Sequence, residues 1–405
     1  MAKPQIRLKG FEGEWEKFEL NQIFQERHVI STITPDLPQL SFTIEEGIIK
    51  PENRKSNKRD FLIKDKTNKK YLVTLLNDII YNPANVIHGA IHKNSLCNGV
   101  VSPIYKIFYT DQNANFLDCI VRRKNFIKEI SKYMEGTVLK LRTLKPESFL
   151  KMSIYIGSVN EQIVIADYFK SLDTMLQSTT KKIESLKQMK QACLVSMFPQ
   201  AGETTPRVRF KGFEGEWGCE PLRSFSKKVI KKNQNLEYRI TLTNSAEYGI
   251  INQLDFFDHD VSNGDNIRGY YIVENDDFVY NPRISASAPV GPINRNQLGY
   301  AGVMSPLYYV FRVYGMSKDY LSVFFKTTLW HKFMKDNGNS GARFDRLSIT
   351  DDVFVQMPIS YPKDIQEQQQ IASFFTSLDK QISLQEKRLE KLKQIKAACL
   401  DKMFV

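Results

Sequence analysis

The sequence predicts an α+β fold with two globular α/β domains in a pseudo-twofold arrangement, separated by an antiparallel coiled coil of two long helices. Three observations lead to this prediction. The 405-residue chain contains an internal repeat. Each copy begins with short apolar runs separated by Gly, Pro and Asn, which is typical of strands and turns. Each copy ends in a segment without Gly or Pro that is dense in helix-forming residues.

The repeat is clearest at the start of each copy. Residues 4–15 read PQIRLKGFEGEW and residues 206–217 read PRVRFKGFEGEW, with nine identities in twelve positions. Shorter matches continue the register between residues 47–49 and 249–251, 81–83 and 280–282, and 99–103 and 302–306. The middles diverge most between residues 50–70 and 252–269. One framework carrying two different recognition surfaces is therefore expected.

The domain boundaries follow from these patterns. We expect a first globular domain over residues 1–155 and a helical spacer over residues 156–200. A second domain follows over residues 201–360, and a second spacer occupies residues 361–405. Residues 199–206, which begin and end with Pro, break the first helix and link the two halves.

A heptad register fits both spacers and predicts a coiled-coil seam. The apolar seam residues are Leu172, Leu176, Ile183, Leu186 and Cys193 in the first spacer, and Leu378, Ile382, Leu389, Leu392 and Cys399 in the second. Polar residues interrupt both seams at matching heights, which could fix the register. The seam from Leu172 to Met197 would span about 40 Å, close to the ~34 Å between half-sites one DNA turn apart. The alternative is that the helices only dimerise or brace the fold.

Composition narrows the class of partner and the compartment. The chain has 57 Lys and Arg against 45 Asp and Glu, a net charge of +12, which favours a polyanion and nucleic acid first. The N-terminal segment lacks a signal-peptide pattern and no apolar run is long enough to span a membrane, so we expect a cytoplasmic protein without membrane association. Five cysteines without a CxxC pair indicate free thiols rather than disulfides or structural zinc.

The repeated motifs carry a family resemblance over the whole chain. They are the opening segments at residues 8–15 and 210–217, the Glu-Gln, Ile-Ala, Phe and Ser-Leu-Asp signature at residues 161–173 and 367–379, and the LKQ(M/I)KxACL runs at residues 186–194 and 392–400. With these motifs the chain resembles the specificity subunit of a bacterial type I restriction-modification enzyme. The resemblance implies two target-recognition domains that each read half of a split DNA sequence, spaced by two helices that dock the methyltransferase subunits.

The resemblance also implies partners and cofactors. Double-stranded DNA, two methyltransferase subunits and restriction or translocase subunits would be the partners. S-adenosylmethionine would belong to the methyltransferase subunit, and ATP and magnesium to the restriction subunit. The subunit itself would be a guide without catalytic residues, and we expect no cofactor in this chain.

The sequence was searched independently for chemistry. GxGxxG after a strand, GxxxxGK[ST] and HExxH are all missing, so nucleotide-binding and zincin readings have no support. Tyr81-Asn82-Pro83 and Tyr280-Asn281-Pro282 lack the second Pro and the aromatic residue of an adenine methyltransferase motif, and a turn is the better interpretation. His88 and His92 are four residues apart, but the neighbouring Gly, Asn and Pro argue against one helical face and a metal site.

In the first half the strongest DNA candidates lie in residues 50–70, which hold nine basic and three acidic residues. Lys and Arg would contact phosphate, and Arg and Asn also offer bidentate contacts to bases. The alternative is a solvated loop. The candidates are Asn53, Arg54, Lys55, Asn57, Lys58 and Arg59, with Lys140 and Arg142 in residues 136–142.

The second half offers a separate set of DNA candidates. They are Arg268, Arg283, Ser285, Arg295, Asn339, Ser340 and Arg343, the last three within a Gly-rich loop at residues 338–343. Lys227, Lys228, Lys231 and Lys232 are either a general phosphate contact or a charged helix face. The repeated Phe11, Trp15, Phe213 and Trp217 are expected to pack in the core rather than stack on bases, because both halves retain them.

Three function classes follow. The first is a sequence-specific, non-catalytic DNA-binding subunit that reads a bipartite target. The second is a stand-alone modification or restriction enzyme, against which the missing cofactor and catalytic motifs count. The third is a coiled-coil scaffold that binds proteins through its basic surface, and a DNA affinity independent of salt would favour it.

Overall fold

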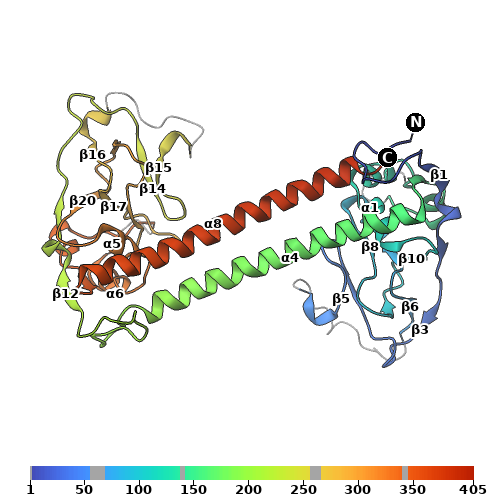
Figure 1. Cartoon of the computed structure of the whole chain (residues 1–405), viewed down its shortest axis with the longest axis horizontal. Coiled ribbons are helices and arrows are strands. Elements are labelled where there is room, and N and C mark those ends of the chain that lie inside the picture. The colour runs from blue at the N-terminus through green and yellow to red at the C-terminus, as the bar shows by residue number, and fades with distance from the viewer. Residues whose placement is uncertain (1, 55–68, 137–141, 256–265, 340–344) are drawn as a thin grey trace. The chain divides into compact units, whose positions relative to one another are not determined.

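The computed structural model describes residues 2–54, 69–136, 142–255, 266–339 and 345–405. The chain divides into two compact units. The first unit combines Met1–Lys181 with Lys387–Val405, and the second unit is Lys182–Glu386. Each unit contains one globular part together with segments of two long helices, α4 (Val159–Ser196) and α8 (Ile365–Lys402) (Figure 1).

The described part of the first unit holds four small antiparallel sheets. Their strand orders are β1-β11, β2-β10-β7-β8, β3-β6-β9 and β4-β5. The strands are β1 (Glu16–Glu19), β2 (Gln25–Glu26), β3 (Ile30–Ser31), β4 (Ser41–Thr43), β5 (Gly47–Ile49), β6 (Tyr71–Thr74), β7 (Ile79–Tyr81), β8 (Ile91–Lys93), β9 (Gly99–Val101), β10 (Lys106–Tyr109) and β11 (Ser153–Ile156). The short helices are α1 (Ala114–Val121), α2 (Lys124–Ile130) and α3 (Pro146–Leu150).

The second unit repeats this topology, except that its third sheet has two described strands rather than three. Its described sheets have the orders β12-β21, β13-β20-β17-β18, β16-β19 and β14-β15. The strands are β12 (Gly218–Pro221), β13 (Ser226–Lys228), β14 (Leu242–Ser245), β15 (Gly249–Asn252), β16 (Tyr271–Val273), β17 (Phe278–Tyr280), β18 (Ile293–Arg295), β19 (Gly302–Met304), β20 (Tyr309–Val313) and β21 (Pro358–Tyr361). Its short helices are α5 (Lys318–Phe324), α6 (His331–Asn337) and α7 (Asp351–Phe354).

The β4–β5 and β14–β15 hairpins show why this topology needs glycine. Gly47 and Gly249 both follow the turn with positive φ angles, 70° and 72°, a conformation that other residues adopt at a steric cost. At Gly47 a side chain is also excluded by packing, because a Cβ atom would lie 2.8 Å from the Cβ atom of His92. The shared Gly-Ile-Ile segments therefore mark the same turn in both units.

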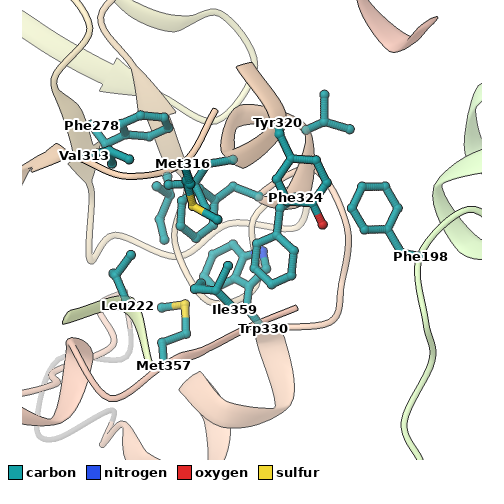
Figure 2. Packing of buried hydrophobic residues seen from close by; sticks show 14 of the residues in the cluster. Phe198, Leu222, Phe278, Val313, Met316, Tyr320, Phe324, Trp330, Met357 and Ile359 are labelled. Carbon is teal, nitrogen blue, oxygen red and sulfur yellow. The ribbon is translucent and has the colours of Figure 1, made fainter. Parts of the chain in front are cut away.

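Each unit has a large aromatic core that includes the residues following a long helix. Phe198, after α4, lies in the core of the second unit, with its ring 5.8 Å from both Trp217 and Tyr320 (Figure 2). Phe404, after α8, occupies the equivalent place in the first unit, with its ring 6.1 Å from Trp15 and 5.5 Å from Phe116. The two tryptophans are 3% and 6% exposed. The prediction of core packing is confirmed for the two tryptophans, whereas Phe11 and Phe213 are half-buried.

Within each unit the two long helices lie antiparallel and share ion pairs. In the first unit Lys396 of α8 pairs with Asp173 of α4. In the second unit Lys190 of α4 pairs with Asp379 of α8, and Lys187 lies 2.6 Å from Glu386. Lys190 and Lys396 hold equivalent heptad positions, as do Asp173 and Asp379. Each unit thus closes its helix pair with the same lysine–aspartate contact.

Most predicted seam residues lie in apolar clusters of these units. Leu172 belongs to the core of the first unit, with Leu392 and Cys399 packed against it. Leu186, Leu378 and Ile382 belong to the core of the second unit, with Cys193 packed against it. Ile183 is buried, and Leu176 and Leu389 are half-buried. The seam prediction is consistent with these positions.

The predicted fold class is confirmed: two α/β domains with antiparallel sheets, and two long helices packed together. The first compact unit is not continuous in sequence, since Lys387–Val405 packs with Met1–Lys181. The domain boundaries expected from the sequence stay predictions. No helix among the described residues is long and apolar enough to cross a membrane.

Candidate nucleic-acid interface

The glutamate of the repeated Glu-Gln signature binds the opening segment of each copy to the long helix at the end of that copy. Glu161, at the first turn of α4, is 1% exposed and accepts hydrogen bonds from Arg7 Nε at 2.7 Å and Nη2 at 2.8 Å. Glu367 of α8 accepts the same two bonds from Arg209, both at 2.8 Å. The opening motif is therefore a clamp that fixes the globular part on its helix.

The neighbouring glutamine of the signature fixes a helix start near the sheet. The Gln162 Oε1 atom accepts from the backbone N–H of Asn113, the N-cap of α1, at 3.4 Å. Gln368 Oε1 accepts from the backbone N–H of Ser317, the N-cap of α5, at 2.9 Å. Both glutamines are buried. The signature thus joins each long helix to the opening segment and to one short helix of its unit by the same two contacts.

A groove of about 470 Å³ opens in the second unit between the β14–β15 hairpin, the segment after β17, and the turn between β19 and β20. Its lining is partly apolar and also contains polar side chains that can donate or accept hydrogen bonds, two of them arginines. They include Thr243, Ser245, Gln253, Asn281, Arg283, Ser285, Tyr308 and Arg346. Such side chains suit contacts to base edges and phosphates.

Three asparagines, Asn244, Asn281 and Asn294, form a floor beneath the β14–β15 hairpin, and the first two of them line this groove. Asn244 on β14 is 1% exposed and donates to the carbonyls of Val279 at 2.7 Å and Pro292 at 3.2 Å. Its side-chain oxygen accepts from Asn294 at 2.7 Å, and its backbone carbonyl accepts from Asn281 at 2.9 Å. Because each amide is satisfied inside the protein, the network holds the hairpin against the sheet.

A second groove of about 270 Å³ adjoins the first, and Pro282, Leu307, Tyr308 and Arg346 line both. Lys228 of β13 lines it too, with its ammonium 5.3 Å from the centre of the Tyr309 ring and paired with Asp351. Burial, reinforced by the charge of Asp351, raises the pKa of Tyr309 to about 12. That tyrosine is a neutral hydroxyl at neutral pH.

The first unit places different side chains at the equivalent floor positions. Phe42 replaces Asn244 and His92 replaces Asn294, and their rings meet edge to face at 5.6 Å. His92 Nε2 lies 2.6 Å from the carbonyl oxygen of Ile44 in the hairpin turn. Burial, followed by the nearby charge of Arg122, lowers the pKa of His92. The two units therefore hold the same hairpin by unlike chemistry.

Each central sheet has a buried aspartate that pairs with an arginine, and the two units supply this arginine from different strands. Asp78 binds Arg27, after β2, at 2.7 and 3.1 Å. Asp277 binds Arg312 of β20 at 2.7 and 2.9 Å. Tyr109 stands in the first unit where Arg312 stands in the second, and its ring lies 4.7 Å from the Arg27 guanidinium carbon. Both units therefore contain a buried aspartate paired with an arginine, but the arginine comes from neighbouring strands in the two units.

The predicted DNA residues of the second unit fall into two groups. Arg283 and Ser285 line the larger groove, and Arg283 lies 3.7 Å from Asp345 with both side chains more than half exposed. Arg268 is exposed and donates to the carbonyl of Gln234 at 2.9 Å. Asn339 is exposed and pairs through its backbone with Ser348. Ser340 and Arg343 lie outside the described residues.

Arg295 differs from these candidates because its side chain is only 7% exposed. Its Nη2 atom lies 2.5 Å from Asp319, and its Nε atom lies 3.7 Å from Asp276. Binding a phosphate would require it to leave both carboxylates. Its geometry suits a structural ion pair better than a DNA contact.

In the first unit the described candidates are Asn53, Arg54 and Arg142. Asn53 and Arg54 are exposed at the end of a 3-10 helix, Pro51–Asn53, and the Arg54 charge acts on the Tyr105 hydroxyl. Arg142 is half-buried and donates to the carbonyl of Gly136 at 3.2 Å. The other candidates, Lys55, Asn57, Lys58, Arg59 and Lys140, lie outside the described residues.

Two interpretations of shorter motifs can be compared with the structure. The turn after β7 is confirmed, since Asn82 Oδ1 accepts from the backbone N–H groups of Ala84 and Asn85 at 3.0 and 3.2 Å. The helical alternative for Lys227 and Lys228 is wrong, because both lie in strand β13. Within the described ranges, no group of three or more His, Cys, Asp or Glu side chains could hold a metal ion.

Several groove residues were not predicted from the sequence, namely Asn244, Asn281, Tyr308 and Arg346. The sequence did carry a signal for Asn244 and Asn294. The repeat aligns them with Phe42 and His92, so the two copies differ at positions that lie between matched segments. For Arg346 the sequence carries no such signal, since the flanking segments of the two halves do not align there.

Comparison with known proteins identifies the relatives of this architecture. Residues 223–394 match the family model of the type I restriction modification DNA specificity domain. The fold is similar to the S subunit of a type I restriction-modification system from M. genitalium, with a TM-score of 0.55 and 14% identity over 100% of this chain and 99% of the other. No curated protein sequence matches significantly.

Two further solved structures are similar with TM-scores of 0.49. One is the HsdS subunit from Thermoanaerobacter tengcongensis, at 14% identity over 96% of both chains. The other is a chain from a solved structure that describes the basis of complex assembly and conformational transition of the type I R-M system. Its identity is 13% over 96% of this chain and 97% of that one.

The shared fold consists of two related domains with antiparallel sheets and a pair of long packed helices. The second half thus matches the type I specificity-domain model over residues 223–394, and the fold of the full length is similar to that of a type I S subunit.

Proposed function

We propose that this chain is the DNA-reading subunit of a type I restriction-modification complex and recognises a bipartite sequence, one half with each globular domain. One observation carries the proposal: two units of the same topology are clamped to their helices by the same contacts, Arg7 to Glu161 and Arg209 to Glu367, yet differ at their hairpin floors. A common framework that carries two different surfaces is suited to the recognition of two different half-sites.

The helices would set the distance between the half-sites. α4 and α8 each have 38 residues, so each is about 57 Å long. Antiparallel ion pairs at both ends of the pair, Lys396 with Asp173 and Lys190 with Asp379, support a fixed register. We propose that the predicted boundaries, domains at 1–155 and 201–360 and spacers at 156–200 and 361–405, separate reading from spacing.

The proposed DNA contacts of the described chain are Asn53, Arg54, Arg142, Arg268, Arg283, Ser285 and Asn339, with Arg346 added from the groove. Arginines beside polar side chains can fix phosphates and read base edges together. The net charge of +12 supports binding to a polyanion.

The chain itself would be non-catalytic. Two methyltransferase subunits would supply S-adenosylmethionine chemistry, and restriction subunits would supply ATP- and magnesium-dependent translocation and cleavage. The match of residues 223–394 to the type I specificity-domain model supports these assignments.

The experiment is a titration of the purified chain, alone and with its methyltransferase subunit, against duplex DNA at several salt concentrations. A DNA-reading subunit gives a steep negative slope of log affinity against log salt. An affinity without such a slope would favour a protein-binding scaffold. Methyl transfer by the chain alone with S-adenosylmethionine would instead make it an enzyme.

A further inference from the structure

An apolar side chain projects from the same turn in both units. Ile104, between β9 and β10, is 58% exposed, and Leu307, between β19 and β20, is 59% exposed. The turns read Ser-Pro-Ile-Tyr and Ser-Pro-Leu-Tyr. Each is closed by a backbone bond, from Tyr105 to Ser102 at 3.2 Å and from Tyr308 to Ser305 at 3.0 Å.

Both turns are held rigidly by the tyrosine that follows the exposed residue. Tyr105 packs against the apolar cluster under the first hairpin, with its ring 5.2 Å from Phe42. Tyr308 packs against the matching cluster of the second unit, and its hydroxyl lies 3.1 Å from that of Thr243. The apolar tips are therefore presented outward on fixed supports.

Arginine side chains lie in the grooves beside the tip of the second unit. Leu307 lines both grooves of the second unit together with Arg346, and Arg283 lines the larger groove. In the first unit burial raises the pKa of Tyr105, and the charge of Arg54 opposes that shift. An apolar tip beside arginines is complementary to duplex DNA, whose phosphates pair with the cations and whose base steps accept apolar wedges.

The tip is common to both units while the hairpin floor beside it is not. Phe42 and His92 occupy the positions in the first unit that Asn244 and Asn294 occupy in the second. A contact shared by two domains that read different sequences cannot itself carry the sequence. Its task must be one that both half-sites require.

We propose that Ile104 and Leu307 are paired wedges, each of which presses into a base step of its half-site and deforms the duplex against the groove. The inference rests on the proposed DNA-reading function and gives it a mechanism of specificity. DNA sequences that deform easily at the wedged base step bind more tightly, although no hydrogen bond is made to that step.

The test uses the full chain assembled with its methyltransferase subunit, and a duplex carrying the target found by methylation mapping, with 2-aminopurine placed at successive positions. Wild-type protein is expected to raise the fluorescence at one step in each half-site. Leu307→Ala abolishes the rise in the second half-site only and weakens binding about tenfold, whereas Leu307→Phe retains both. A mismatch at the affected step restores the affinity of Leu307→Ala.

Val208→Ala is the matched control, since Val208 is also apolar, 52% exposed and repeated as Ile6 outside the grooves. It should behave as wild type. Unchanged affinity and fluorescence for Leu307→Ala would overturn the wedge and leave the proposed function standing. Absence of DNA binding by the wild-type complex would overturn the proposed function itself.

Discussion

Arg7 donates two hydrogen bonds, at 2.7 and 2.8 Å, to a Glu161 carboxylate that is 1% exposed and 154 residues further along the chain. Arg7 also donates to the carbonyl of Gly13 at 2.6 Å, which ties the clamp to its own motif. The second unit repeats the arrangement with Arg209, Glu367 and Gly215. Two motifs distant in sequence are thus one structural device.

The first prediction concerns loss of this cation. Arg209→Met leaves Glu367 buried without its charge partner, so the free energy of unfolding of the second unit should fall by about 3 kcal/mol. Urea denaturation of the full chain, followed by tryptophan fluorescence, measures the change. The double variant Arg209→Met/Glu367→Met should recover most of the loss. A single variant as stable as wild type would show that the clamp is not important for folding.

The second prediction separates two equivalent tryptophans. Trp15 Nε1 donates to Glu161 at 3.1 Å, whereas Trp217 Nε1 is buried with no partner among the described residues. Trp15→Phe should therefore cost about 1 kcal/mol more than Trp217→Phe, since only the first breaks a hydrogen bond to a charged group. Equal losses in thermal unfolding of the two variants would contradict the different pairing.

The third prediction concerns pH. Burial, with the nearby charge of Arg122, lowers the pKa of His92 in the folded chain, while Asp118 opposes the shift. The unfolded chain, with a pKa of about 6.5, then binds the proton first. The stability due to neutral His92 is present above that value and is lost as the pH falls through it toward the lower folded pKa.

The matched variant is His92→Asn, which installs the residue of the equivalent position, Asn294. Between about pH 7.5 and pH 5.5, wild-type protein should lose more stability than this variant. Denaturant midpoints at both pH values provide the comparison, in which the other titrating groups are shared. Parallel loss in both proteins would show that His92 does not set the response.

The fourth prediction distinguishes two arginines of the second unit. Arg346→Ala should weaken DNA binding and make the slope of log affinity against log salt less negative by about 0.9, the effect of one lost phosphate contact. Arg295→Ala should leave the slope unchanged and lower the stability by about 1 kcal/mol, because its guanidinium is committed to Asp319. The reverse pattern would make Arg295 the DNA contact.

The sequence predicted the framework well because the framework is repeated. Heptad positions such as Leu172 and Leu378, and the buried tryptophans, recur at fixed offsets, and chance cannot maintain such a pattern. The short strands were expected only in outline, since their ends depend on tertiary pairing. The burial of Arg295 was missed, because an arginine that pairs with two carboxylates looks the same in sequence as one that faces solvent.

The grooves were the hardest part to predict. Their lining combines residues from the β14–β15 hairpin, the segment after β17 and Arg346, which are more than a hundred residues apart in sequence at the extremes. Spacing within one segment carries no information about such an assembly. Asn244 differs from Phe42 at the equivalent position of the first unit, but only the fold showed that Asn244 lines a groove.

The central claim is that each globular domain reads one half of a split target, and one measurement tests it most directly. The chain is co-expressed with its methyltransferase subunit in a host without DNA methylation, and methyladenine is mapped across the genome. The same is done after residues 206–360 are exchanged for those of a related chain. The account predicts a split motif that keeps one half and changes the other. A single-block motif, or a motif that changes in both halves, would contradict it.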